Sequence, residues 1–334
     1  MFIDGKKGSL ILILKVLEEY SDNDHYLTQQ DIINKISSLY GLELERKTIG
    51  ANINLLIELG YDIVKKEKGG YCLLSRLFDV SEVKFLIDAI YSSKTLTGKQ
   101  ANELAKAISS TLSKYERKEY NYLYKSEEIN RNINKDFFLN IDIINEAIKE
   151  NKMISFNYIT YDNNGKQIYK YNGYRYKVSP YYLVNNFGKY YLLSYYRYDK
   201  STNFRVDYMR NIEILDTLRK PISDVSDLGD NFNISKYINN HIYMFGGELI
   251  DAVVKLENEQ AITYVIDWFG SDVSLFKEND SLYAKIKCDD QAFIHWVLQY
   301  INFVTVVKPL YIKDKIIDIL QSNLNKYKCE KTGS

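Results

Sequence analysis

The stretch that decides the fold runs from Tyr176 to Leu215 and reads YKVSPYYLVNNFGKYYLLSYYRYDKSTNFRVDYMRNIEIL. It belongs to a region, residues 156–208, that holds 14 of the chain's 31 tyrosines. Aromatic residues favour pleated strands, and turn signals at 172–173, 185–188 and 199–203 divide the apolar segments. The spacing predicts several short strands in a small barrel or a strongly bent sheet.

The same region is the basic part of a chain whose formal net charge is zero. Residues 141–222 carry thirteen Lys and Arg against eight Asp and Glu, and arginines interleave with the tyrosines. A guanidinium can bind a phosphate through two parallel hydrogen bonds, and a tyrosine ring can stack on a base. The composition indicates a surface for an anionic ligand, although an excess of five charges is also common on unspecialised surfaces.

The N-terminal part has a different pattern, with apolar residues at helical spacing in three segments. The second segment begins at Thr28, a good N-cap, and ends at Gly41; the third lies between Arg46 and Gly60. The sequence from Tyr61 to Leu74 then predicts a β-hairpin that turns at Gly69-Gly70. Three short helices followed by a hairpin predict a winged helix-turn-helix.

A winged helix-turn-helix sets its recognition helix, here the third, into the major groove of DNA. Basic side chains there can bind phosphate or guanine, and asparagine can pair with adenine. Residues 1–75 nevertheless contain two more acidic than basic residues, so a protein-interaction module remains an alternative reading. The candidate DNA contacts are Arg46, Lys47, Thr48, Asn52, Asn54, Lys65, Lys66 and Lys68.

The remaining segments complete a multidomain α+β protein, since 334 residues exceed the size of one compact core. Residues 79–140 predict two helices, with caps at Ser81 and Thr97, that connect domains or mediate dimerisation. Residues 245–328 alternate strands and helices, which predicts a compact C-terminal α+β domain.

Taken in order, these segments resemble the WYL-domain transcriptional regulators of bacteria. The namesake tripeptide corresponds to Tyr190-Tyr191-Leu192, with Tyr in place of the usual Trp. VSPYYL precedes it at 178–183 and FRVDYMRNI follows it at 204–212. The chain departs from the family at Tyr208, where Arg is usual, which puts anion binding there in doubt unless Arg210 compensates.

The resemblance implies four parts: a winged helix-turn-helix at 1–78, a helical linker at 79–140, an Sm-like β-barrel (the WYL domain) at 141–222 and a C-terminal extension at 245–328. It further implies a homodimeric regulator that binds double-stranded DNA and senses a nucleic acid or nucleotide. The ligand-binding candidates are Ser179, Tyr190, Tyr195, Arg205 and Arg210.

Two of these assignments have a structural alternative. Arg205 and Asp207 lie two residues apart, so on a strand they would share a face and could pair with each other, with Tyr208 on the opposite face. The hydroxyl of Ser179, which precedes Pro180, could serve a turn instead of a ligand.

Enzymatic and metal-dependent functions have little support in the sequence. The three histidines lack metal-ligand spacing, the three cysteines are scattered, and nucleophile-elbow and phosphate-loop motifs are missing. The longest apolar runs are too short to span a bilayer. We therefore expect a cytoplasmic binding protein with neither cofactor nor catalysis. The alternatives are a single-stranded nucleic acid or RNA-binding protein whose N-terminal module contacts proteins and, more remotely, an enzyme acting on nucleotides.

Overall fold

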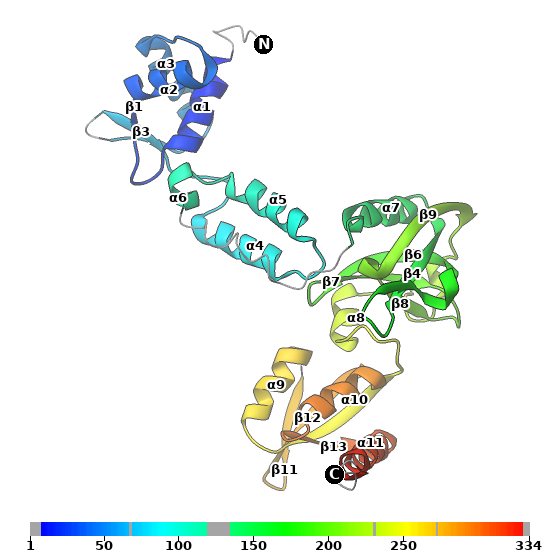
Figure 1. The fold of residues 1–334 in the computed structure, drawn as a ribbon. Helices are drawn as coiled ribbons and strands as arrows, with labels where there is room; N and C mark the ends of the chain where they lie inside the picture. Colours follow the sequence, from blue (N-terminus) through cyan, green and yellow to red (C-terminus); the bar gives the residue numbers. More distant parts are fainter. Residues whose placement is uncertain (1–7, 67–68, 119–133, 230–231, 272, 330–334) are drawn as a thin grey trace. The chain divides into compact units, whose positions relative to one another are not determined.

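The computed structural model describes residues 8–66, 69–118, 134–229, 232–271 and 273–329. The chain divides into two compact units, Met1–Lys135 and Asp136–Ser334. Both units combine α-helices with antiparallel sheets (Figure 1).

The first part of the N-terminal unit has three helices and a three-stranded sheet with the order β1-β3-β2. Isoleucines and leucines on the inner faces of the three helices form one core. The described elements are α1 (Ser9–Tyr20), β1 (Leu27–Thr28), α2 (Gln29–Tyr40), α3 (Arg46–Glu58), β2 (Ile63–Lys65) and β3 (Gly70–Leu73).

Local sequence signals determine where α2 begins and ends. The Thr28 side chain accepts a hydrogen bond from the Asp31 backbone N–H, and the Asp31 side chain accepts one from the Thr28 backbone N–H. This capping box satisfies two backbone donors that a helix start leaves unpaired. Gly41 ends the helix in the left-handed conformation, at a φ of 64°. The predictions of the cap and of the terminating glycine are confirmed.

Three further helices follow, α4 (Val80–Ser92), α5 (Gly98–Ser109) and α6 (Lys114–Lys118). Thr97 caps α5 as expected, through a capping box with Gln100. The expected cap of α4 at Ser81 is wrong, because Asp79 forms the capping box with Glu82 and starts the helix earlier. Residues 119–133 of the expected linker lie outside the described residues.

The second unit opens with a helix that covers one face of a six-stranded sheet (Figure 1). The strands follow the order β5-β4-β6-β7-β8, and β9 also pairs with β4, on the edge opposite β6. The elements are α7 (Phe137–Lys149), β4 (Lys152–Tyr161), β5 (Gln167–Tyr169), η2 (Lys170–Gly173), β6 (Arg175–Asn186), β7 (Lys189–Tyr195), β8 (Ser201–Arg205), η3 (Val206–Tyr208) and β9 (Met209–Leu218).

The expected Sm-like barrel is not closed in the residues that the structure describes. In the described residues, β8 forms a strand ladder only with β7, and β9 forms one only with β4. The 3-10 turn η3 lies between β8 and β9, so the chain leaves one edge of the sheet and joins another without a ladder between the two strands. The observed form is an open six-stranded sheet.

Aromatic cross-strand pairs form much of the sheet's core. Phe156 of β4 lies directly opposite Tyr176 of β6, and their rings stack with centroids 5.5 Å apart. Phe204 of β8 packs edge-on against Phe156 at 5.1 Å. Such pairs add about 0.5–1.5 kcal/mol beyond the area they bury. Part of the tyrosine-rich stretch therefore serves packing.

The polar stretch after β9 has a structure that its composition did not indicate. It contains η4 (Ile222–Asp224) and α8 (Ile234–Asn240). Val225, Leu228, Tyr237 and Met244 from this stretch form a buried cluster with residues of β6 and β7. The segment thus packs on the sheet as part of the same unit.

The C-terminal part is a four-stranded antiparallel sheet, ordered β11-β12-β10-β13, packed against helices. Its core includes Trp296, Phe293 and Ile312, all fully buried. The predicted order of strands and helices is confirmed. The elements are β10 (Leu249–Leu256), α9 (Gln260–Phe269), β11 (Ser274–Glu278), β12 (Ser281–Asp289), α10 (Asp290–Gln299), β13 (Val304–Lys308) and α11 (Leu310–Cys329).

Candidate functional site

The strand β8 delivers Arg205 to a partly open position at the edge of the sheet. The Arg205 backbone N–H donates a hydrogen bond of 3.0 Å to the hydroxyl of Tyr158 on β4. The Arg205 side chain is 25% exposed, so the guanidinium is neither buried in the core nor fully in solvent. Arg205 is accessible to a ligand from one side.

Asp207 holds the Arg205 guanidinium through two hydrogen bonds. Nε donates to Oδ1 over 3.1 Å and Nη2 donates to Oδ2 over 2.6 Å. Burial by itself lowers the pKa of Arg205, but the hydrogen bonds and the charge of Asp207 raise it, so the group stays cationic. Within the described residues Nη1 makes no hydrogen bond to the protein. The internal pair forms, and it leaves one edge of the guanidinium available.

The ring of Tyr208 lies against the Arg205 guanidinium, with 4.1 Å between Cζ and the ring centroid. The expectation that Tyr208 points to the opposite face is wrong. Residues 206–208 form a 3-10 turn rather than a strand, and a 3-10 turn aligns the side chains of residues three apart. At the position where Arg is usual in the resembling family, this chain therefore has an aromatic ring that supports Arg205.

Three further tyrosines surround Arg205 and Tyr208, and none of them is among the ligand-binding candidates predicted from the sequence. Tyr191 on β7 is the register partner of Arg205. Tyr158 and Tyr161 both pack edge-on against Tyr208, at 5.8 and 6.2 Å. Burial raises the pKa of Tyr158 and of Tyr191, so both hydroxyls stay protonated at neutral pH. The register of β7 on β8, once known, is the signal that distinguishes Tyr191 from Tyr190.

Arg210 lies near the same turn but is largely engaged by the protein. Its Nη1 donates to the backbone carbonyl oxygens of Asp207 and Met209, each at 2.8 Å, and Nη2 donates to Gln167 Oε1 at 3.3 Å. Burial lowers the pKa of Arg210. Its first role is to brace the turn that presents Arg205.

The other three predicted ligand contacts lie apart from Arg205. Ser179 is buried, and its Oγ accepts a hydrogen bond from the Lys220 backbone N–H at 3.0 Å, which is a structural role. Tyr190 packs edge-on against Phe137 of α7. Tyr195 lies 4.1 Å below the Lys220 ammonium group, measured to its ring centroid.

The third helix of the N-terminal unit presents part of its predicted DNA-binding set to solvent. Lys47 and Asn54 are exposed, and the exposed Arg46 donates to Gln30 Oε1 of α2 at 3.0 Å. Thr48 is half-buried. Asn52 is half-buried too, and its side-chain amide donates to Ser9 Oγ of α1 at 3.0 Å. That bond directs Asn52 toward α1 rather than outward.

The predicted DNA-contacting lysines of the β2–β3 hairpin also differ in their surroundings. Lys65 is exposed at the end of β2. The Lys66 ammonium group lies over the ring of Tyr26, 5.2 Å from its centroid. Lys68 lies outside the described residues.

The described residues also bear on metal binding and membrane insertion. They contain no group of three or more His, Cys, Asp or Glu side chains arranged to hold a metal ion. Nor do they include a helix with the length and apolar character needed to cross a membrane.

Comparison with known protein families identifies the sheet. Residues 140–214 match the family model of the WYL domain, so the chain contains a WYL domain. The match begins in α7 and ends in β9, and it includes Arg205, Asp207 and Tyr208. For this part of the chain the sequence resemblance is confirmed.

Two solved structures are similar to the chain at 14% sequence identity each. One is proteasome accessory factor B/C (PafBC) of Arthrobacter aurescens, with a TM-score of 0.31 over 96% of this chain and 49% of that one. The other is a CRISPR Cas-related protein, with a TM-score of 0.37 over 97% of this chain and 84% of that one. The chain thus spans about half the length of PafBC. No curated protein sequence matches it.

Proposed function

We propose that the protein is a DNA-binding transcriptional regulator whose WYL domain binds a nucleic acid or nucleotide effector. The observation that carries the proposal is the Arg205 guanidinium, held by Asp207 and backed by the Tyr208 ring, with Nη1 still free to donate. A charged, oriented donor beside tyrosine rings suits a phosphate next to a base.

The N-terminal unit would supply the DNA contact as a winged helix-turn-helix. Supporting this assignment, α2 and α3 pack together on α1, and the β2–β3 hairpin follows α3 directly. In this proposal α3 enters the major groove with Lys47 and Asn54 outward, and Lys65 lies beside the backbone. Arg46, bonded to Gln30, sits at the start of the same helix.

The proposal includes a homodimer in the cytoplasm and binding without catalysis. Two copies would place two recognition helices on DNA, and the effector would favour one spacing of those helices over another. The effector thus acts by shifting a population rather than by chemistry.

Binding of fluorescent oligonucleotides to the full chain tests the effector part. We expect Arg205→Ala to weaken the binding of a single-stranded oligonucleotide about tenfold, which corresponds to a loss of roughly 1.4 kcal/mol in binding free energy. Arg175→Ala is the matched control, because Arg175 is also paired with a carboxylate, that of Glu213, on the same sheet. Equal losses for the two variants would remove Arg205 from the site.

One observation favours the alternative, a single-strand or RNA-binding protein whose N-terminal module contacts proteins. Several large apolar side chains of the N-terminal module are exposed, including Leu39, Leu55, Ile57 and Leu59. Exposed apolar groups of this kind mark protein interfaces.

Duplex and single-stranded probes of the same sequence separate the two functions. A regulator binds the duplex, with an affinity that falls as salt rises, and loses affinity in Lys47→Ala. The alternative predicts tight binding of the single-stranded probe and an affinity for the duplex that Lys47→Ala leaves unchanged.

A further inference from the structure

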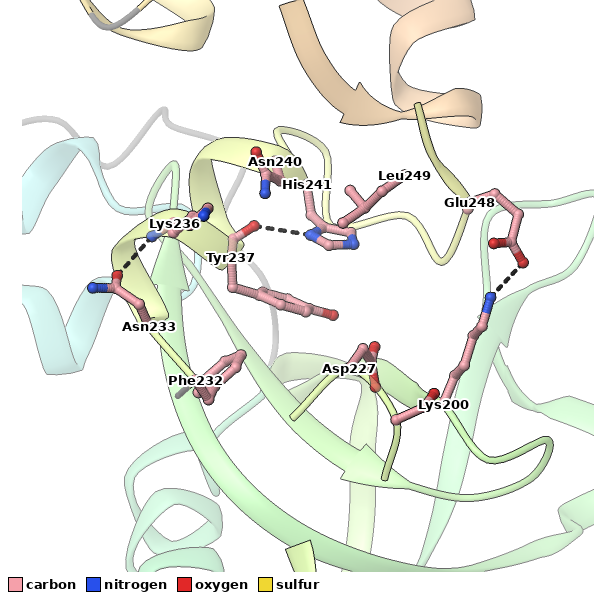
Figure 2. A pocket seen from close by; sticks show the side chains of 12 residues that line it. Lys200, Asp227, Phe232, Asn233, Lys236, Tyr237, Asn240, His241, Glu248 and Leu249 are labelled. Atoms are coloured by element: carbon pink, nitrogen blue, oxygen red, sulfur yellow. Dashed lines mark hydrogen bonds and ion pairs between the residues drawn. The ribbon is translucent and has the colours of Figure 1, made fainter. Parts of the chain in front are cut away.

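A pocket of about 420 Å³ lies between α8, the start of β8 and the segment that leads into β10 (Figure 2). This volume falls within the range of small-molecule sites, roughly 300–1,000 Å³. The pocket does not include Arg205 or any residue around it. It is therefore separate from the proposed effector site.

The most informative group in the pocket is His241. The residue is 6% exposed, and its Nδ1 lies 2.9 Å from the carbonyl oxygen of Tyr237. Because a carbonyl oxygen can only accept, Nδ1 carries the hydrogen and Nε2 is left as an acceptor. Burial lowers the pKa of His241, so the ring is neutral at pH 7. Nε2 has no hydrogen-bond partner in the described residues, and Figure 2 shows it turned away from that carbonyl.

The His241 ring is held firmly in this orientation. It stacks on the Tyr237 ring, with centroids 4.1 Å apart and planes 19° apart. The Tyr237 hydroxyl lies 3.0 Å from Ser201 Oγ and 3.1 Å from Asn203 Oδ1, both on β8, and its single hydrogen can be donated to either of them. An unpaired acceptor on a buried, immobilised ring is poised for a donor from a ligand.

Asp227 supplies a second acceptor to the same pocket. Its Oδ1 accepts from the Ser201 backbone N–H at 2.8 Å, and its Oδ2 accepts from the Ser201 hydroxyl at 2.7 Å. Each carboxylate oxygen can accept one further hydrogen bond. The rings of Phe232 and Tyr237, which are tilted by 58° to each other, add apolar surface to the lining beside these acceptors.

The charges around the pocket do not favour an anion. Lys200 is neutralised by its ion pair with Glu248, which also lines the pocket, as Figure 2 shows. Lys236 and Asp227 balance each other in sign, so the lining as a whole has no net positive charge. An unscreened phosphate would meet the Asp227 carboxylate.

We propose that this pocket binds a small flat molecule, uncharged or singly cationic, that donates N–H groups to His241 Nε2 and to the Asp227 carboxylate. An amino-substituted heterocycle or an aryl amidine has this chemistry. The pocket joins the WYL sheet, through Lys200 and Asp227, to the segment before β10, through Glu248. Its occupant would therefore tie the WYL sheet to the C-terminal sheet.

Long-range ¹H–¹⁵N spectra of the histidine rings in the full chain at pH 7.5 test the proposal directly, because the chain has only three histidines. The probes are adenine, 2-aminobenzimidazole and benzamidine, with inorganic phosphate as the anionic comparison. We expect Nε2 of His241 to be unprotonated in the free protein. At least one of the three donor probes should shift its signal, while His25 and His295 stay unchanged.

Matched variants then assign the contact. Asp227→Ala should weaken the binding of the responding probe about tenfold or more. Asp224 is a neighbouring exposed carboxylate outside the pocket, so Asp224→Ala should change the affinity of that probe less than about twofold. Three results would overturn the proposal. They are a free protein with the proton on Nε2, no His241 shift from any donor probe at about 5 mM, or a shift produced by phosphate alone.

Discussion

The Arg205 guanidinium lies 4.1 Å from the ring centroid of Tyr208, three residues further along the chain. A strand would have placed these side chains on opposite faces, but the 3-10 turn of residues 206–208 brings them together. A cation over an aromatic face contributes about 0.5–2 kcal/mol, depending on how far it is desolvated. Tyr208 thus supports the Arg205 cation at the position where the sequence resemblance implies a second one.

The first prediction concerns that replacement. Tyr208→Arg introduces the residue that the sequence resemblance implies at this position and places a second cation beside Arg205. We expect tighter binding of a single-stranded oligonucleotide and a slope of log affinity against log salt that is steeper by about one unit or slightly less. Binding titrations at several salt concentrations measure both quantities.

Tyr198→Arg is the matched control for Tyr208→Arg, because Tyr198 is an exposed tyrosine of the WYL domain that lies outside the group of tyrosines around Arg205. This variant adds the same positive charge at a position that is not beside Arg205. If both variants gain affinity equally, the effect is non-specific attraction rather than restoration of a site.

The second prediction concerns the Arg205–Asp207 pair. The Asp207 side chain is 2% exposed, so Arg205→Ala leaves a buried carboxylate without two of its hydrogen bonds. We expect the free energy of unfolding to fall by about 1–3 kcal/mol. Adding Asp207→Asn to Arg205→Ala should recover part of that loss, and a double-mutant cycle by urea denaturation measures the coupling. A coupling near zero would contradict the pairing.

The third prediction separates two asparagines of α3. Asn52→Ala removes the hydrogen bond to Ser9 Oγ and should lower the stability of the N-terminal unit by about 1 kcal/mol. Asn54 is exposed, so Asn54→Ala should change the free energy of unfolding by less than about 0.5 kcal/mol. It should weaken the binding of duplex DNA instead. Thermal unfolding and duplex titration of both variants provide the comparison. A stable Asn52→Ala protein with weakened DNA binding would reassign Asn52 to the interface.

The fourth prediction concerns Asp289, which caps α10 from a fully buried position. Its Oδ1 accepts from the Ala292 N–H at 2.8 Å, whereas Oδ2 has no hydrogen-bond partner in the part of the chain that the structure describes. Burial, with a smaller contribution from the charge of Asp290, raises the pKa of Asp289 to about 6 from an ordinary value of 3.8. The folded protein therefore binds an extra proton between these values, and its stability falls as pH rises through that window.

Asp289→Asn keeps the capping oxygen and removes the buried charge. We expect it to unfold at a higher temperature than the parent protein at pH 7, with a gain of roughly 1–3 kcal/mol that shrinks toward pH 4. Asp290→Asn is the control, because it makes the same change at the next residue of the helix start and its amide oxygen can still accept from the Glu248 N–H, so we expect no comparable gain. A gain for Asp289→Asn that does not depend on pH would contradict the raised pKa.

Local sequence patterns were sufficient for most of the helices and strands. The capping box at Thr28, the glycine at position 41 and the alternation in β10 to β13 each depend on residues a few positions apart. Those interactions are the same in any fold that contains the element. The Tyr-Tyr-Leu tripeptide at 190–192, which resembles the family's namesake motif, likewise lies inside the matched WYL domain.

The three-dimensional structure alone decided which side chains meet. Tyr191 rather than Tyr190 lies opposite Arg205 because the register of β7 on β8 is set by strand pairing, and a one-residue slip exchanges the two faces. Tyr158 reaches Arg205 from a strand 47 residues away. The open sheet, and the pocket that holds His241, likewise depend on where β9 and α8 pack. Contacts between distant segments leave no periodic trace in the sequence, so only the folded chain reveals them.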